Sequence, residues 1–287
     1  MSDLQVQAEL GLRARQTGPT SRRIGVAEGL AAALALFLVI SALAPQLVAP
    51  GDPLAIDPLS AFQPPSARHG FGTDESGRDI YTRVVHGTGN SLLIGVLATA
   101  IGLGLGIVLG TLAGMLGRVV DFTVNRVLEV LFAFPGLLLA LLVILIYGPG
   151  AATATIAVGL STAPGYARII RAQLVSVRSS SFVEAATVLG LTPWRTLTRH
   201  ILPNTLAPLV VLATLGIGQA IVWATALSYL GLGAQPPTAE WGAMLSAGRT
   251  YITSAWWMSF FPGLFIVLTA VAATTLGRAI ERRMRHA

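Results

Sequence analysis

The sequence of 287 residues contains no cysteine and no lysine, so all 19 of its basic residues are arginine. Without cysteine, the chain forms neither a disulfide nor a thiolate metal site. Without lysine it has no P-loop, because the lysine of that motif contacts the nucleotide phosphates. Any ATP used on behalf of this chain must therefore be bound by another protein.

Charge is scarce as well. Only 11% of the residues are charged and 53% are hydrophobic, whereas charged residues make up about 25% of an ordinary soluble domain. The mean hydropathy is +0.70. This composition excludes one or two ordinary soluble domains and predicts a membrane protein.

Long apolar runs are what the sequence has instead. A transmembrane helix requires about 20 mainly apolar residues. Six segments meet this requirement, at approximately 25–48, 88–117, 122–147, 150–173, 205–230 and 254–280. Trp256 and Trp257 stand at the start of the last one, where aromatic side chains anchor a helix at the membrane surface. The sequence predicts an all-α polytopic membrane protein with six transmembrane helices.

The arginines are distributed unequally between the loops. If the N-terminus is cytoplasmic, fifteen of the nineteen lie in cytoplasmic segments, where basic residues of membrane proteins accumulate. Both termini and the loop 174–203 are therefore expected in the cytoplasm. The net charge of +6 then fits an anionic membrane surface and not a nucleic acid.

The predicted organisation has four parts. These are a cytoplasmic arm (1–24), a first helix with an external loop (25–87), a five-helix core (88–280) and a cytoplasmic tail (281–287). The alternative for the first segment is a cleaved signal peptide, because Arg22 and Arg23 precede an apolar run that ends in small residues at 42–44. Pro45 would follow the cut directly, which disfavours cleavage.

The second span carries a stripe of glycines on one helix face, at Gly102, Gly106, Gly110 and Gly114. Such a stripe permits close approach of a neighbouring helix, within the bundle or in a second subunit. Pro135, Pro164 and Pro262, each followed by glycine, interrupt three other spans. These breaks predict kinks or, alternatively, stretches of backbone that line a pathway.

Ionisable side chains are rare within the spans. Arg126 and Glu129 are spaced for an ion pair on one helix face. Ion-coupled transporters usually keep carboxylates near the membrane midplane, and this sequence places none there, which argues against that class. Gln219, Trp223 and Thr225 are the candidates for lining a pathway, with hydrogen bonding between helices as the alternative.

The loop that includes residues 181–204 is polar. Ser181 and Glu184 have the spacing of a capping box, which would start a short helix. Gly190 suits the left-handed residue that ends such a helix. One side of this helix would show Phe182, Ala185, Ala186 and Leu189. An exposed strip of small and apolar residues of this kind favours docking into a groove of another protein.

A second short helix is expected directly afterwards. Thr192 is a suitable N-cap, with Pro193 at the first helical position. Pro203 would end this helix, and Asn204 would cap the next span. Local rules thus predict a helix, a tight turn and a second helix between two spans.

Several motifs occur in the order found in one known family. Glu184-Ala185-Ala186, then Gly190, then Ile201-Leu202-Pro203 resemble the EAA signature of ABC importer permeases. Residues 72–79 (GTDESGRD), 165–168 (GYAR), 230–237 (LGLGAQPP) and 241–242 (WG) resemble stretches of the second, "C-type" membrane subunit of the dipeptide, oligopeptide and nickel subfamily. The resemblance covers about residues 25–277.

The resemblance implies a type I importer permease fold, with no enzymatic activity of its own, in a bacterial plasma membrane. It implies a pore shared with a homologous second permease subunit, an external substrate-binding protein, and two ATPase subunits or one fused ATPase that bind ATP and Mg. The cargo would be a dipeptide, a longer peptide, a glutathione-like compound or nickel. Transport would proceed by alternating access: ATP would close the ATPase dimer, and the cytoplasmic loop helices would transmit that movement to the bundle.

The resemblance also assigns roles to residues. Coupling to the ATPase would involve Glu184, Ala185, Ala186, Gly190, Ile201, Leu202 and Pro203. The external motifs contain Asp74, Gly77, Arg78, Asp79, Gln235, Pro236, Pro237 and Trp241, whose role would be structural or contact with the binding protein. The C-terminus departs from the family pattern, because Arg278, Arg282 and Arg283 replace an acidic tail and suit a membrane surface. The competing classes are an ion-coupled secondary transporter and a membrane scaffold that transports nothing.

Overall fold

The computed structural model describes residues 25–285, and helices provide the regular structure of this part of the chain. The predicted arm of residues 1–24 lies outside the described residues. The longer helices are α2 (Val26–Leu43), α4 (Ile80–Met115), α5 (Arg118–Phe132), α6 (Gly136–Tyr147), α7 (Ala151–Arg178), α10 (Leu202–Tyr229) and α12 (Trp257–Arg285). The shorter ones are α3 (Pro45–Val48), η1 (Pro58–Ser60), α8 (Ser181–Val188), α9 (Pro193–Thr196), η2 (Leu197–Ile201), α11 (Trp241–Gly248) and η3 (Arg249–Tyr251).

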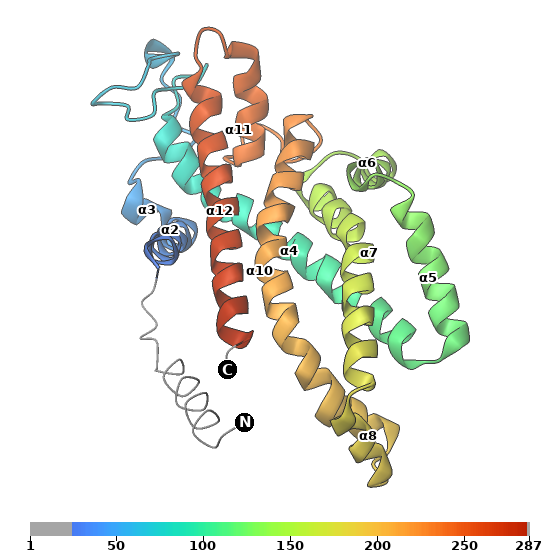
Figure 1. Cartoon of the computed structure of the whole chain (residues 1–287). Helices are drawn as coiled ribbons and strands as arrows, with labels where there is room; N and C mark the ends of the chain where they lie inside the picture. Colours follow the sequence, from blue (N-terminus) through green and yellow to red (C-terminus); the bar gives the residue numbers. More distant parts are fainter. Residues whose placement is uncertain (1–24, 286–287) are drawn as a thin grey trace, which may run out of the picture.

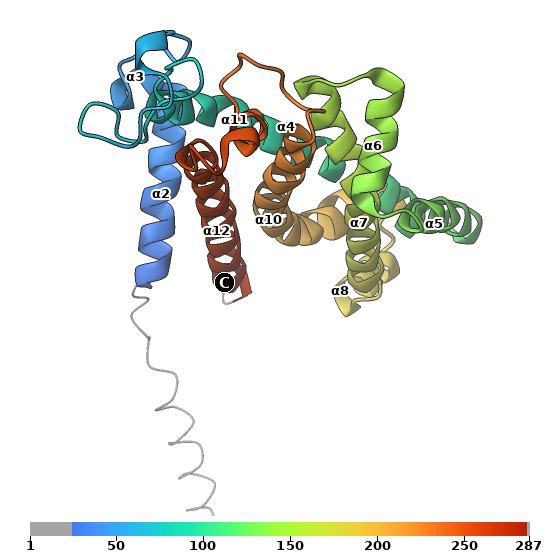
Figure 2. The same cartoon turned by 90° about the horizontal axis from the view of Figure 1, so that it is seen from above.

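Three long helices, α7, α10 and α12, run alongside one another, and α4 crosses them diagonally (Figure 1). In the view from above, α2 lies beside α12 at one side of the bundle, and α5 with α6 lies at the opposite side (Figure 2). The segment containing α8 projects from one end of the bundle in Figure 1, while α11 and the loop before α4 lie at the other end. The molecule therefore presents two loop regions at opposite ends.

Four of the described helices are long and apolar enough to cross a membrane, namely those covering Val26–Leu43, Ile80–Met115, Pro208–Tyr229 and Trp257–Met284. The pair α5 and α6 adds a fifth span if it is counted as one. The fourth predicted segment, α7, is a single continuous helix of 28 residues. It does not meet the same criterion within the described chain.

The chain bends by 89° between α5 and α6, so the kink predicted at Pro135 within the segment 122–147 is confirmed. Pro135 lies in the break. Its ring removes a backbone donor and clashes with the preceding turn, which prevents a continuous helix. The second span also begins earlier than expected, because Asp79 caps α4 at Ile80. The helix α12 continues to Arg285, so the boundary expected at residue 280 is not the end of an element.

The most extensive helix contact among the described residues joins α4 to α7, and the glycine stripe lies in it. A Cβ on Gly106 would lie 2.5 Å from Cβ of Tyr166, and one on Gly110 would lie 2.8 Å from the carbonyl oxygen of Ala167. Gly102 and Gly114 likewise face α7. The stripe therefore packs within the bundle, where only glycine lets the two backbones approach this closely.

Candidate functional sites

The projecting loop begins with α8, and its first turn differs from the expected capping box. Ser180, not Ser181, is the N-cap residue, and its hydroxyl donates to the carbonyl of Val177 at 2.5 Å. No side chain caps the helix. The amide of Glu184 bonds to the carbonyl of Ser180 at 3.1 Å, and the exposed Glu184 carboxylate is available for other contacts.

The turn after α8 has the expected geometry. Gly190 has a φ of +79°, a region that costs a side-chain-bearing residue strain. The amide of Leu191 bonds to the carbonyl of Ala186 at 3.1 Å, as in a Schellman motif. The hydroxyl of Thr192 then accepts the amide of Arg195 at 3.4 Å and caps α9. The turn is thus determined by local chemistry.

The expectation that Pro203 ends the second helix is wrong. The chain runs from α9 through the π-helical turn η2 directly into α10. A wider π turn shifts the hydrogen bonds before Pro203, which accommodates a residue that has no amide donor. Asn204 is not an N-cap, because its side-chain amide nitrogen donates to the backbone carbonyl of His200 at 2.6 Å.

The tip of this loop is apolar and exposed. The exposed fractions of Val188, Leu189 and Trp194 are 82%, 79% and 70%. Ala185 is exposed as well. We call Glu184, Ala185, Val188, Leu189 and Trp194 the loop tip. Contiguous apolar patches of this kind mark interaction sites.

The opposite side of α8 is buried against the bundle. Ala186 is 5% exposed and Val183 is 5% exposed, and Ile201 is 1% exposed. Val183 and Ile201 belong to one apolar cluster with Ile170 of α7. The expectation that Ala186 lies on the exposed strip is therefore wrong. Two further residues were assigned to ATPase coupling by the family resemblance. Of these, Leu202 is half-buried and Pro203 is exposed.

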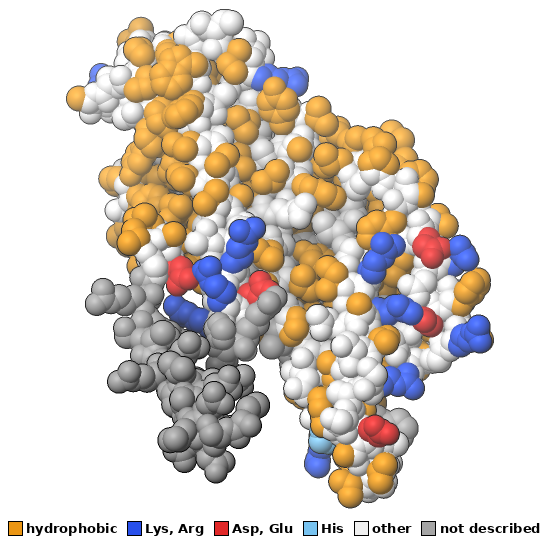
Figure 3. Space-filling model, viewed as in Figure 1, with side chains coloured by type: hydrophobic (Ala, Val, Ile, Leu, Met, Phe, Trp, Pro, Cys, Tyr) orange, Lys and Arg blue, Asp and Glu red, His pale blue; other side chains and the backbone are white. Residues whose placement is uncertain are grey.

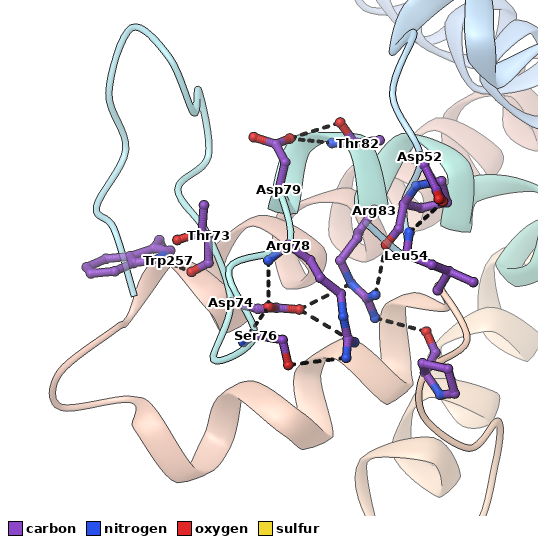
Figure 4. Close-up of polar contacts among 12 residues, drawn as sticks. Asp52, Leu54, Thr73, Asp74, Ser76, Arg78, Asp79, Thr82, Arg83 and Trp257 are labelled. Atoms are coloured by element: carbon purple, nitrogen blue, oxygen red, sulfur yellow. Dashed lines mark hydrogen bonds and ion pairs between the residues drawn. The ribbon is translucent and has the colours of Figure 1, made fainter. Parts of the chain in front are cut away.

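At the other end of the bundle, Asp74 organises the loop before α4 (Figure 4). Its carboxylate accepts the amides of Ser76 and Arg78, both at 2.9 Å. The guanidinium groups of Arg78 and Arg83 both lie 3.7 Å from it. The side chain of Asp74 is 8% exposed, so the charge is paired where water has little access.

Arg83, which the sequence analysis did not single out for this role, joins three segments. Its side chain is 7% exposed. Besides the ion pair with Asp74, it donates to the carbonyl of Pro53 at 3.1 Å and to that of Pro237 at 3.3 Å. No sequence signal pointed to it, because the second span was predicted to begin at residue 88 and Arg83 therefore lay in the predicted external loop.

Gly77 and Asp79 complete the motif. Gly77 has a φ of +76°, and a Cβ there would collide with the backbone of Asp57. Asp79 caps α4 through the amide of Thr82 at 2.8 Å, and the His69 ring lies 2.9 Å from it. The hydroxyl of Ser60 donates to Asp57 at 2.7 Å and lowers the pKa of that carboxyl.

The segment 235–242 packs beneath this loop. The amide nitrogen of Gln235 donates to the carbonyls of Gly231 and Gly233 at 3.0 and 3.1 Å. Trp241 is fully buried, and its indole donates to the carbonyl of Val84 at 2.9 Å. Pro236 lies in the same segment and, with Asp74, lines a small cavity.

Glu240, which was missed from the sequence, holds this segment, and Trp257, for which a different role was predicted, holds the loop before α4. Glu240 caps α11 by accepting the amides of Gly242 and Ala243 at 2.8 and 2.9 Å, and it is 3% exposed. The indole of Trp257 donates to the carbonyl of Thr73 at 3.0 Å. Trp257 is 6% exposed, so its predicted position at the membrane surface is wrong, whereas its neighbour Trp256 is 51% exposed.

The pathway candidates divide into two groups. Gln219 and Trp223 of α10 line one cavity with residues of α5, α6 and α7. Thr225 does not line it and lies against Gly242 of α11. The division of these three residues could not be predicted from their positions around the helix, because it depends on where α6 and α11 cross α10.

Two further ion pairs involve residues of α5. Arg126 and Glu129 are 2.7 Å apart, as their spacing predicted, and both are exposed. Arg171 of α7 holds Asp121 of α5 with two contacts of 2.5 and 2.6 Å, a pair that the sequence analysis missed.

Comparison with known proteins identifies the family to which this architecture belongs. Residues 106–286 match the family described as the binding-protein-dependent transport system inner membrane component. The chain is 42% identical over 245 residues to the dipeptide transport system permease protein DppC of Alkalihalophilus pseudofirmus, covering 85% of this chain and 80% of the relative. It is 41% identical over 217 residues to the glutathione transport system permease protein GsiD of Pectobacterium atrosepticum, covering 76% and 72%.

Solved structures share the fold. The inward-facing MetNI methionine ABC transporter matches with a TM-score of 0.59 and 20% identity, over 71% of this chain and 97% of that chain. An amino acid ABC transporter matches with a TM-score of 0.57 and 16% identity, over 71% and 94%. The helical bundle therefore has the type I ABC importer permease fold.

The chain belongs to the family of inner membrane components of binding-protein-dependent transport systems. It is a transport permease, the membrane-embedded subunit of an ABC importer.

Proposed function

We propose that this permease carries short peptides from an external binding protein into the cytoplasm, driven by ATP hydrolysis in partner ATPases that bind the loop tip. The observation that carries the proposal is the exposed apolar surface of Val188, Leu189 and Trp194 at the end of the bundle. The cargo is supported by the names of similar proteins, which are permeases for dipeptides, other peptides and glutathione.

The charge distribution supports an orientation with the loop tip and both termini in the cytoplasm. On the face shown in Figure 3, most of the arginines lie in the half of the molecule that carries α8, and few lie in the opposite half. Cytoplasmic segments of membrane proteins are enriched in arginine. In this orientation α11 and the loop with Asp74 face outward, where a binding protein delivers its cargo.

The ATPases must be separate subunits, since the chain contains no lysine for a P-loop. The buried side of α8, through Val183 and Ala186, is packed on the bundle. A movement imposed on the exposed side therefore reaches α7 and α10 through this contact. A second permease subunit completes the pore.

The test is uptake by a reconstituted complex of this chain with its partner permease, ATPases and binding protein. We expect peptide uptake that requires both ATP and the binding protein. Leu189→Asp places a charge on the apolar tip and is expected to abolish uptake and the binding-protein-stimulated ATPase. Leu189→Met is the matched control, because it keeps an apolar side chain of similar volume at the same position.

Uptake by the chain without ATP would contradict the proposal and favour an ion-coupled transporter. Uptake and ATPase rates that are equal in the Leu189→Asp and wild-type complexes would contradict docking at the loop tip.

A further inference from the structure

A cavity of about 290 Å³ lies where the bent span breaks, between α5, α6, α7 and α10. Its lining includes Phe132, Gly136, Ser161, Thr162, Gln219 and Trp223. Its size is at the lower end of the range for small-molecule pockets, about 300–1,000 Å³. Gln219 is exposed and Trp223 half-buried, so the cavity is accessible from the side of α10.

The backbone at the break has free hydrogen-bonding groups. Within residues 25–285, no hydrogen bond reaches the carbonyl oxygens of Phe132, Ala133 and Phe134. The carbonyl of Pro135, in contrast, accepts the amides of Leu138 and Leu139 at 2.8 and 3.1 Å. Unpaired carbonyls persist at membrane depth only where protein covers them or where they line a cavity. Phe132 and Phe134 do line this cavity.

The indole of Trp223 lies against the break between α5 and α6. Its ring lies so close to Gly136 that a Cβ on that glycine would come within 2.7 Å of Cζ3. The two residues are on different helices, α10 and α6, so their contact ties the position of the indole to the break. Any side chain at position 136 would displace the indole.

The chemistry of the lining is neutral. Among the residues that line the cavity, none carries a side-chain charge at neutral pH. Their polar side-chain groups are the hydroxyls of Ser161, Thr162 and Tyr166, the amide of Gln219 and the indole N–H of Trp223. Hydroxyl, amide and carbonyl groups match the hydrogen bonds of a peptide backbone. A transition metal such as nickel prefers imidazole or thiolate ligands, and these side chains offer neither.

We propose that this cavity is a passage site for short peptides, recognised through their backbone, and that Trp223, seated on Gly136, sets the largest peptide side chain that passes. The inference rests on the proposed function and adds the residues that select cargo within the membrane. The carbonyls of Phe132 and Phe134, which line the cavity, accept peptide N–H groups, and the indole limits the width beside them.

The test uses the complete reconstituted transporter and two tripeptides, trialanine and Ala-Trp-Ala. Trp223→Ala widens the cavity, and we expect it to raise the uptake of Ala-Trp-Ala relative to trialanine by about fivefold. Gly136→Ala drives the indole into the cavity, and we expect it to lower the uptake of both peptides by about tenfold. The double variant is expected to regain uptake, because the residue that clashes has been removed.

The ATPase stimulated by the binding protein is measured in parallel, so that the uptake of each peptide is expressed per ATP hydrolysed. Gly104→Ala is the control for a glycine in a helix, because no atom lies within 4 Å of its added Cβ. An unchanged peptide preference in Trp223→Ala, or a double variant as impaired as Gly136→Ala, overturns the inference. A wild-type complex that transports neither peptide overturns the proposed function itself.

Discussion

The guanidinium of Arg83 lies 3.7 Å from the carboxylate of Asp74, and both side chains are almost completely buried. Arg83 belongs to the first turn of α4, whereas Asp74 belongs to the loop that precedes it. The pair therefore fixes the loop to the longest helix of the described chain. The same arginine reaches Pro237, so the segment before α11 is fixed as well.

Asp74→Asn is expected to lower the free energy of unfolding by about 3–5 kcal/mol, because it leaves buried arginines without a counter-charge. The measurement is denaturant or thermal unfolding in detergent. Glu129→Gln is the matched control, since it removes an exposed ion pair and is expected to cost about 0–1 kcal/mol. Equal losses in the two variants would show that the Asp74 pair is not buried in the membrane protein.

Gly106→Ala is expected to destabilise the bundle by about 1–3 kcal/mol, because its Cβ has no room against Tyr166. Gly104→Ala, two residues earlier on the same helix, faces open space. It is expected to be neutral or to stabilise the helix by up to about 1 kcal/mol. Unfolding in detergent compares the two variants, and the opposite ranking would exclude the packing of the glycine stripe on α7.

Gly190→Ala is expected to strain the loop by about 1–2 kcal/mol, because φ is positive at this residue. Its side chain would meet no neighbour within 4 Å, so the cost is confined to the backbone. Gly190→Asn should be tolerated better, since asparagine adopts this conformation more readily. Limited proteolysis of the loop measures the effect; equal sensitivity of the alanine and asparagine variants would contradict it.

The adjacent tryptophans are expected to respond differently to substitution by phenylalanine. Trp257→Phe loses the hydrogen bond to Thr73 and is expected to cost about 1 kcal/mol or more. Trp256 is half exposed, so Trp256→Phe is expected to stay within about 0.5 kcal/mol of the wild type. Thermal unfolding distinguishes them, and a larger loss at Trp256 would reverse our assignment of the buried residue.

Local features of the fold could be predicted because their causes are local. The apolar runs predicted the helices, the glycine spacing predicted a face of close approach, and the left-handed Gly190 followed from the turn it had to make. The capping box failed because the helix begins one residue earlier, with Ser180 at the N-cap position, so Glu184 lies at N4 and not at the N3 position that the motif requires. The stop at Pro203 failed because a π turn accommodates the proline within a continuous helix.

The sequence by itself determined that this chain is a membrane protein built on long apolar helices, and that it has no lysine with which to form a P-loop. These properties depend on composition and on neighbours along the chain. Only the tertiary structure decided that Arg83 pairs with Asp74, that Trp257 and not Trp256 is buried, and that Trp223 closes the break at Gly136. Each of these contacts depends on how the helices cross and where the chain bends, and residue types alone do not specify that.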